Sequence, residues 1–167
     1  EAGTLQLGNG GTTGSLSSNT IELDDSATLA INRTSNLELS GDIKDVDLDG
    51  DSNTGGTVTI DATGATITFS GSSDYAGGTT VSAGILKAGS SIATDDNDAF
   101  VGAAFGTGLV TIADGAELDL NSQSIRNNLN LSGRGVDTDN DGTGNSGALN
   151  HTGSDLAVVE GDITLGA

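Results

Sequence analysis

The sequence predicts an all-β chain wound as a right-handed, single-stranded parallel β-helix, or β-solenoid. Three observations lead to this fold class: short runs in which apolar and polar residues alternate, many glycines without proline, and blocks that repeat in order. Alternation predicts strands, because successive side chains of a strand point to opposite faces of a sheet. The 27 glycines and the absence of proline fit a fold with many tight corners.

The predicted strands are short and are distributed along much of the chain. Each carries Leu, Ile, Val or Phe at alternate positions, and they cover residues 21–23, 28–31, 37–39, 58–60, 67–69, 110–112, 118–120 and 129–131. Threonine is frequent between the apolar residues, and β-branched side chains suit a solvated sheet face. Only 2% of residues are aromatic, so we expect a core of Val, Ile, Leu and Ala in thin layers.

Internal repetition separates a solenoid from a sandwich or a barrel, which short strands alone would also fit. Residues 2–8 are echoed at 83–89, and residues 27–31 are echoed at 116–120. A Leu-Ser-Gly tripeptide follows each copy of the second block, at 39–41 and at 131–133. Such repetition favours stacked turns of about 20 residues, each stabilised by its neighbours.

The chain starts without methionine and within a strand-like pattern. We therefore expect residues 1–167 to be a single β-helix segment of a longer repetitive protein. Its partners would be the neighbouring coils of that protein. Open strand edges at a cut end are also expected to permit self-association.

One block resembles a known repeat. Tyr75, the Gly-Gly-Thr-Thr run at 77–80, Val81 and the Ala-Gly-Ile-Leu run at 83–86 closely resemble the autotransporter-associated β-strand repeat. Residues 2–14 resemble the end of a preceding copy, and residues 105–120 resemble the turn that commonly follows. The resemblance covers most of the chain and implies a parallel β-helix, export to the bacterial surface, and a passenger or stalk role in an adhesin-like protein. The acidic balance and two acidic insertions depart from the family pattern.

The charge of the chain excludes several partners. With 24 acidic and 5 basic side chains, the formal net charge is -19. Nucleic acid is a poor partner, because its binding needs clustered Lys and Arg.

No apolar run approaches 18 residues, so no membrane insertion by this segment is expected. The absence of cysteine excludes a small disulfide-stapled scaffold.

Two acidic loops, inserted at about 42–55 and 134–147, have the pattern Asp-x-Asp-x-Asp-Gly. Carboxylates at positions 1, 3 and 5 can converge on one hard cation, and the residue at position 7 gives a backbone carbonyl. The predicted Ca²⁺ ligands are Asp45, Asp47, Asp49 and Asp51 in the first loop and Asp137, Asp139, Asp141 and Thr143 in the second. The acidic ligand of an EF-hand at position 12 is absent, because Gly56 and Ala148 occupy that position. Both loops follow a Leu-Ser-Gly tripeptide, so we expect them at the same type of corner.

The alternative interpretation of these loops is a solvated acidic turn, since Asp and Gly are ordinary turn residues. The cluster of Asp95, Asp96 and Asp98 lacks the alternating spacing, and we interpret it as a solvated loop. His151 is the only histidine, and a nearby Ser154 and Asp155 do not make a triad, which needs an oriented base. No catalytic residues are assigned, and the chain is not expected to be an enzyme.

The predicted function is that of a calcium-stabilised structural stalk or passenger segment of a bacterial surface or secreted protein, anchored to the outer membrane through another part. Two other classes stay open. One is a calcium-dependent binding module for cell-surface or partner contact. The other is an enzyme that acts on polysaccharide, although Phe69, Tyr75, Phe100 and Phe105 are the only aromatic residues that could stack on sugars.

Overall fold

The computed structural model describes residues 3–17, 19–47, 55–137 and 146–166. These residues form an all-β structure with a large parallel sheet and no helix, so this part of the predicted fold class is confirmed. No helix in these ranges could cross a membrane. The strands are β1 (Thr4–Gly11), β2 (Thr20–Leu23), β3 (Thr28–Arg33), β4 (Leu37–Leu39), β5 (Asp42–Asp45), β6 (Thr57–Phe69), β7 (Thr79–Ala88), β8 (Ala93–Thr94), β9 (Phe100–Gly102), β10 (Val110–Ile112), β11 (Ala116–Asp119), β12 (Leu129–Leu131), β13 (Leu149–Asn150) and β14 (Ile163–Leu165).

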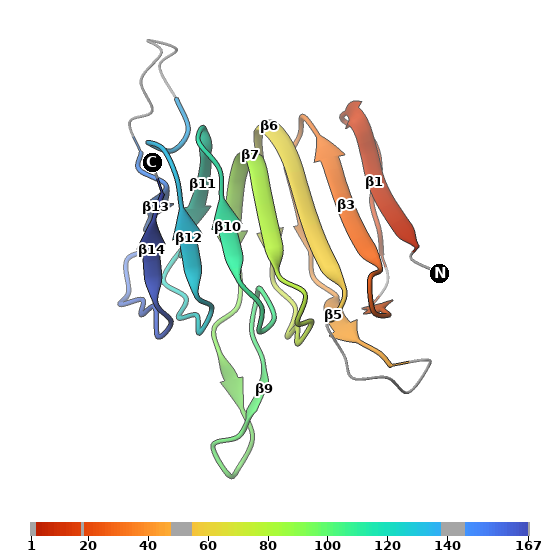
Figure 1. Cartoon of the computed structure of the whole chain (residues 1–167), viewed down its shortest axis with the longest axis vertical. Coiled ribbons are helices and arrows are strands. Elements are labelled where there is room, and N and C mark those ends of the chain that lie inside the picture. Colours follow the sequence, from red (N-terminus) through yellow and green to blue (C-terminus); the bar gives the residue numbers. More distant parts are fainter. Residues whose placement is uncertain (1–2, 18, 48–54, 138–145, 167) are drawn as a thin grey trace.

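The large sheet contains a first ladder of seven strands in the order β1-β3-β6-β7-β10-β12-β14. Every neighbouring pair is parallel, and the order follows the chain from one side of the molecule to the other (Figure 1). Parallel strands need a crossover between them, and the described parts of these crossovers contain loops and further strands but no helix.

A second ladder runs β4-β6-β7-β11-β13, again with parallel neighbours. The long strands β6 and β7 belong to both ladders, and their register shifts between Asp61 and Thr66. The predicted strands at 58–60 and 67–69 are therefore two parts of one strand. A third ladder consists of the parallel pair β2 and β5.

The core is built from columns of side chains that lie in register across the ladders. One column of the first ladder contains Leu7, Ile31, Ile60, Val81, Ile112 and Leu131, which are all buried. The second ladder contributes Ile67, Leu86 and Leu118, each fully buried. Burial of aliphatic side chains at alternate positions is the main source of stability here, which agrees with the alternation in the sequence.

The few aromatic residues are concentrated in the core. Phe69, Tyr75 and Phe105 are fully buried, and the rings of Phe69 and Phe105 lie 6.1 Å apart. The Tyr75 hydroxyl is 2.6 Å from the Thr79 hydroxyl, so the buried polar end has a partner. The core is thus not purely aliphatic, in contrast to the expectation from the 2% aromatic content.

Glycines of the repeat-like block occupy positions that a side chain cannot fill. Gly84 has φ +84°, and a Cβ there would collide with the backbone carbonyls of Ala62 and Ala65. Gly78 has φ +90°, and a Cβ would lie 2.6 Å from the carbonyl oxygen of Leu109. Both positions need a residue without a side chain, because φ is positive and a neighbouring backbone is close.

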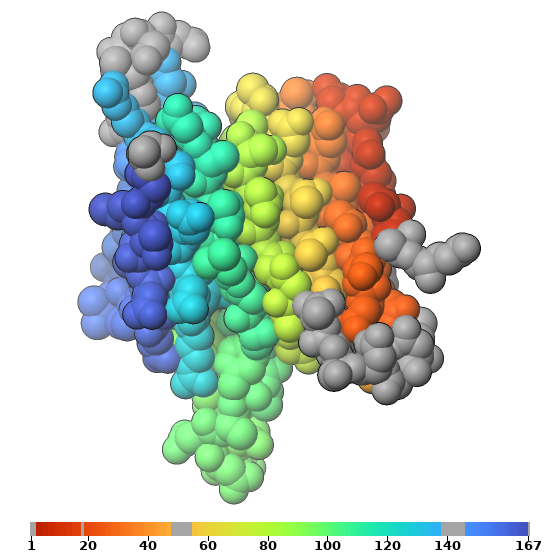
Figure 2. All heavy atoms as spheres, viewed as in Figure 1, coloured from red at the N-terminus to blue at the C-terminus, as the bar shows by residue number. Residues whose placement is uncertain are grey.

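The acidic cluster at 95–98 forms the turn of an antiparallel hairpin made by β8 and β9. Asp95 accepts hydrogen bonds from the amides of Asn97 (2.8 Å) and Ala99 (3.0 Å), which lower its pKa. The hairpin, green in Figure 2, stands out from the body of the molecule. The expected solvated loop is therefore exposed as predicted but has a regular structure that the sequence did not indicate.

Candidate functional site

Asp45, the first predicted calcium ligand, ends β5 and binds two neighbouring backbone segments. Its Oδ1 accepts a hydrogen bond from the amide of Gly56 at 3.0 Å, and its Oδ2 accepts one from the amide of Ala76 at 2.8 Å. Burial raises the pKa of Asp45; the two hydrogen bonds oppose this rise, and the nearby carboxylates of Asp74 and Asp25 add to it. A raised pKa means that the charged carboxylate is disfavoured at this position, and a cation bound beside Asp45 would stabilise it.

Other aspartates repeat this arrangement at neighbouring levels. In three pairs, a side-chain oxygen accepts a hydrogen bond from an amide about one repeat away: Asp25 from Gly55 (3.1 Å), Asp42 from Ser72 (2.7 Å) and Asp74 from Asp45 (3.2 Å). Lys44 lies among them, with its Nζ 3.5 Å from Asp74 Oδ2 and 2.6 Å from the Ser72 carbonyl oxygen. These carboxylates therefore join successive corners of the chain instead of only facing water.

Most of the predicted calcium ligands lie outside the described residues. Asp45, Asp47 and Asp137 are described, whereas Asp49, Asp51, Asp139, Asp141 and Thr143 are not. Within the described ranges, no three His, Cys, Asp or Glu side chains gather closely enough to hold a metal ion. Calcium binding by either loop stays a prediction.

The flanks of the two acidic loops lie at different corners. Asp45 contacts Gly56 and Ala76, which precede β6 and β7. Val136 and Asp137 instead line a depression with Gly64 and Gly84, at the bends within β6 and β7. The expectation of equivalent corners is wrong, because the first loop leads into the first ladder and the second loop leads out of it.

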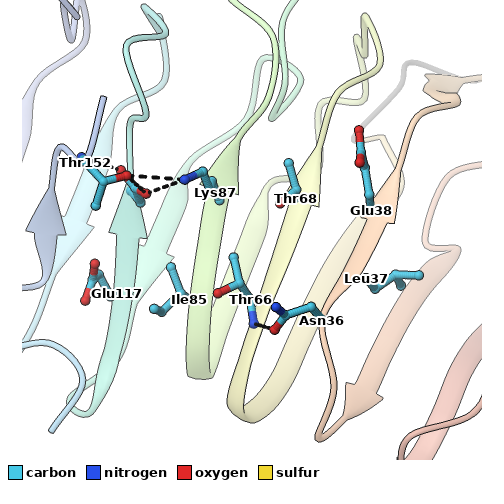
Figure 3. Close-up of a pocket in the computed structure, with 10 residues that line it drawn as sticks. Asn36, Leu37, Glu38, Thr66, Thr68, Ile85, Lys87, Glu117 and Thr152 are labelled. Atoms are coloured by element: carbon cyan, nitrogen blue, oxygen red, sulfur yellow. Dashed lines mark hydrogen bonds and ion pairs between the residues drawn. The ribbon is translucent and has the colours of Figure 1, made fainter. Parts of the chain in front are cut away.

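The outward face of the second ladder carries a shallow depression of about 630 Å³ across β4, β6, β7 and β11 (Figure 3). Eight of its ten lining residues are polar: Asn36, Glu38, Thr66, Thr68, Lys87, Glu117, Asp119 and Thr152, with Leu37 and Ile85 as the apolar ones. Sheet register places Glu38, Thr68, Lys87 and Asp119 side by side in one row. We call these ten residues the polar face.

Asp119 is the most highly connected residue of the polar face, and it is only 3% exposed. Its Oδ1 accepts hydrogen bonds from the amides of Asn121 (2.9 Å) and Thr152 (3.0 Å), and its Oδ2 accepts one from the Thr152 hydroxyl (2.5 Å). Lys87 Nζ lies 3.2 Å from Oδ2. Burial alone would raise the pKa of Asp119, but these hydrogen bonds outweigh it and lower the pKa.

Glu117 lies two residues before Asp119 on the same face of β11 and is 2% exposed. Its Oε1 accepts a hydrogen bond from Asn150 Nδ2 at 2.9 Å. No role was assigned to Glu117 or Asp119 from the sequence. The alternation within β11 could have identified this pair, because it places two acids on the outward face of a strand.

His151 is held by backbone groups on both sides of its ring. The amide of Ser122 donates a hydrogen bond to Nδ1 at 3.2 Å, and Nε2 lies 2.9 Å from the carbonyl oxygen of Asp155. The second contact requires a proton on Nε2. The ring therefore joins two turns that are far apart in the sequence.

No protein-family model, curated protein or solved structure matches the chain. The resemblance of residues 74–86 to the autotransporter-associated β-strand repeat therefore stays a prediction.

Proposed function

We propose that the chain is a right-handed, single-stranded parallel β-helix that serves as a structural stalk or passenger segment of a bacterial surface or secreted adhesin-like protein. The observation that carries this proposal is the order in which the chain visits the ladders. β3, β4 and β5 belong to the first, second and third ladders, and the next strand, β6, returns to the first. β10 with β11, and β12 with β13, repeat the step from the first ladder to the second.

The spacing along the chain supports the same architecture. Register partners in the first ladder, from Thr4 through Thr28 to Thr57, are separated by roughly 20 to 35 residues over the whole ladder, a length typical of one solenoid turn. We assign the right hand because parallel crossover connections in one sheet are almost always right-handed.

A stalk needs length and stiffness rather than a reaction centre, and stacked turns supply both. Each turn satisfies its backbone groups through the turns on either side, so added turns extend the structure without a new core. The aspartates at the corners contribute side-chain hydrogen bonds between successive turns. The net charge of -19 keeps such a surface hydrated.

Surface labelling of intact producing cells tests this role. Antibodies raised against the purified chain should label unbroken bacteria, or the secreted material, at the level seen after permeabilisation. Labelling that requires permeabilisation would contradict an exported stalk, and antibodies against a cytoplasmic protein provide the control.

Calcium is proposed to stabilise the two acidic loops. Binding to the folded state alone should raise the melting temperature, with a gain of about 2.7 kcal/mol at a hundredfold excess over Kd. D49N and D141N should each reduce the calcium-dependent rise, whereas D96N, in the β8–β9 hairpin, should leave it unchanged. Equal melting temperatures of the wild type in calcium and in chelator would remove calcium from the proposal.

The polar face favours a second candidate function, a binding module for an extended, hydroxyl-rich chain such as a glycan. It provides carboxylates, hydroxyls, an amide and an ammonium group at the strand spacing of about 4.8 Å, and Ile85 and Leu37 offer small apolar contacts. A glycan panel tests it with E38Q, which changes an exposed carboxylate of the polar face and should weaken binding, and with E22Q on β2 as the control. Cleavage of a bound glycan would instead favour the polysaccharide-acting enzyme, and absence of binding would leave the stalk alone.

A further inference from the structure

The segment that follows β13, residues 151–155, lies across the turn that follows β11. The amide of Ser122 in this turn donates a hydrogen bond to Nδ1 of His151 at 3.2 Å, and the amide of Asp155 donates one to Oγ of Ser122 at 2.9 Å. A Cβ on Gly153 would collide with Ser122, so the two segments are in direct contact. We call residues 151–155 the strap.

The strap also forms one end of the polar face. Thr152 donates hydrogen bonds to Asp119 from its amide at 3.0 Å and from its hydroxyl at 2.5 Å, and the Lys87 ammonium group donates to the same hydroxyl at 3.3 Å (Figure 3). Asp119 is buried, so movement of the strap would leave a buried charge with fewer partners and would admit water to it.

The turn opposite the strap has an uncommon backbone conformation. Asn121 and Ser122 both have positive φ, at 47° and 64°, and residues with a side chain keep such angles only where their surroundings hold them. The amide of Asn121 donates to Asp119 at 2.9 Å, and its Nδ2 donates to the carbonyl oxygen of Ala88 at 3.0 Å. Ser122 is held from the strap, through its amide and its hydroxyl. The strap and the turn therefore stabilise each other.

Polar contacts attach the strap to the turn. Its sequence is His-Thr-Gly-Ser-Asp, without Leu, Ile, Val or Phe. The core residues on either side of the turn, Leu118 and Ile125, are fully buried and belong to the ladders instead. Segments that are held by hydrogen bonds and bury few apolar groups open locally at a low free energy. The strap can therefore open without unfolding the core.

His151 is the residue of the strap whose hydrogen bonding depends on pH near neutrality. Histidine is the side chain that ordinarily changes charge between about pH 5 and 8. In the neutral ring Nε2 carries the proton, because it lies 2.9 Å from the carbonyl oxygen of Asp155, and Nδ1 accepts the hydrogen bond from Ser122. A second proton would occupy Nδ1, so that two donors would face each other.

The surrounding charges do not replace the lost hydrogen bond. Four charged groups lie on the strap or on the strands that contact it: Asp155, Glu117, Asp119 and Lys87. The turn itself, residues 121–124, carries no charge. Within the described part of the chain, no carboxylate lies at ion-pair distance from the His151 ring, and Asp119 already lies beside Lys87.

We propose that the strap opens when His151 takes up a second proton, so that mildly acidic conditions loosen one end of the polar face. The switch belongs to the free protein, and it is independent of the stalk role and of glycan binding. Loss of one hydrogen bond should shift the equilibrium between the closed and the open strap by about fivefold.

Amide exchange followed by NMR tests this switch at about pH 5.5 and about pH 7.5, on either side of the value near 6.5 that is usual for histidine. Protection factors, which correct for the intrinsic effect of pH on exchange, should fall about fivefold in acid at Ser122 and Asp155. The amide of Val58, which donates to the carbonyl oxygen of Gly78 in the first ladder, should keep its protection. His151 is the only histidine, so its ring signal is unambiguous, and the Ser122 amide shift should follow it with the same midpoint.

Three variants separate His151 from its neighbours. H151N keeps an acceptor for the Ser122 amide but does not titrate, so its protection should be the same at both pH values. H151A removes the acceptor and should lower the protection at both pH values, whereas D155N removes a nearby carboxylate and should respond as the wild type does. The proposal is wrong if wild-type protection does not change, if the two midpoints differ, or if H151N responds to pH. It is equally wrong if D155N loses the response or if H151A matches the wild type at the higher pH.

Discussion

Replacing Asp119 with alanine removes a carboxylate that joins Asn121, Thr152 and Lys87. The carboxylate accepts hydrogen bonds from the amide of Asn121 and from the amide and hydroxyl of Thr152, and it lies beside the Lys87 ammonium group. Because the register pairs Asp119 with Lys87 and with Asn150 on either side, the change affects contacts among β7, β11 and the segment after β13.

The expected cost of D119A is about 2 to 3 kcal/mol in the free energy of unfolding. A hydrogen bond to a charged group contributes about 1.5–3 kcal/mol, and a buried donor left without a partner costs about 1–3 kcal/mol. We take the lower part of the combined range, because Thr152 is exposed and water can replace one acceptor. Urea unfolding should show a lower midpoint with an unchanged slope.

K87A provides the matched control. The Lys87 side chain is 29% exposed, and ion pairs that reach solvent contribute about 0.2–1 kcal/mol. K87A should therefore cost less than about 1 kcal/mol. If K87A lowers the free energy of unfolding as much as D119A does, the ion pair between Lys87 and Asp119, and not the backbone hydrogen bonds, stabilises this face.

The lowered pKa of Asp119 adds a pH dependence with a defined sign. A depressed pKa in the folded state means that the carboxylate contributes stability above the pKa of an unfolded aspartate, 3.8, and that this contribution is lost as the pH falls through the lower folded value. The difference in stability between wild type and D119A should stay constant down to about pH 4 and shrink below it. A difference that shrinks near neutral pH would contradict the assignment.

Two further changes test the close contacts of the core. G84A should lower the free energy of unfolding clearly more than G115A does, because both glycines have positive φ (+84° and +81°) but only Gly84 lies against another backbone. The backbone strain that both variants share costs about 1–2 kcal/mol. Equal melting temperatures of the two variants would contradict the close approach. Y75F should lower the free energy of unfolding by about 1 kcal/mol, because it leaves the buried Thr79 hydroxyl without its partner. The double variant Y75F/T79V should regain most of this stability, since both partners are then removed. If the losses of the two single variants simply add in the double variant, the hydrogen bond between these residues is refuted. Burial raises the pKa of Tyr75, so stability should fall as the pH rises above the unfolded value of 10.0, and phenolate absorbance of this single tyrosine should appear only with unfolding.

Alternation of apolar and polar residues was sufficient to locate most strands. The predicted runs at 28–31, 110–112 and 129–131 fall within β3, β10 and β12 and supply in-register core residues. This success has a physical basis, because a parallel ladder aligns residues of one type above one another and every turn must bury the same positions.

The repeated blocks were less informative about position. Residues 27–31 lie in the first ladder, whereas their echo at 116–120 lies in the second. Likewise, residues 4–7 of the first copy of the other block begin the first ladder, whereas residues 85–88 of its echo lie in the second. All ladders need the same alternation of apolar and polar residues and glycine at the corners, so similar sequences can occupy different faces. For this reason the expectation that the two acidic loops share one type of corner was wrong.

The side-chain pairs of the polar face depend on register, which the sequence does not specify. Lys87 and Asp119 lie side by side only because β7 pairs with β11 at that offset. The hydrogen bond that Asp25 accepts from the amide of Gly55 depends in the same way on how neighbouring turns are aligned. The fit of Phe69 against Phe105 likewise needs three-dimensional packing that periodicity does not reveal.

Distances between spin labels along the first ladder test the central claim of stacked turns most directly. Gln6, Thr59, Thr111 and Thr164 lie in one outward column, on strands that are two steps apart in the ladder order. At about 4.8 Å per strand, the backbone separations from Gln6 should be roughly 10, 19 and 29 Å. Pairs of introduced cysteines carrying nitroxides should therefore give three distances that increase in even steps, and a short distance between positions 6 and 164 would show that the chain closes on itself rather than extending turn by turn.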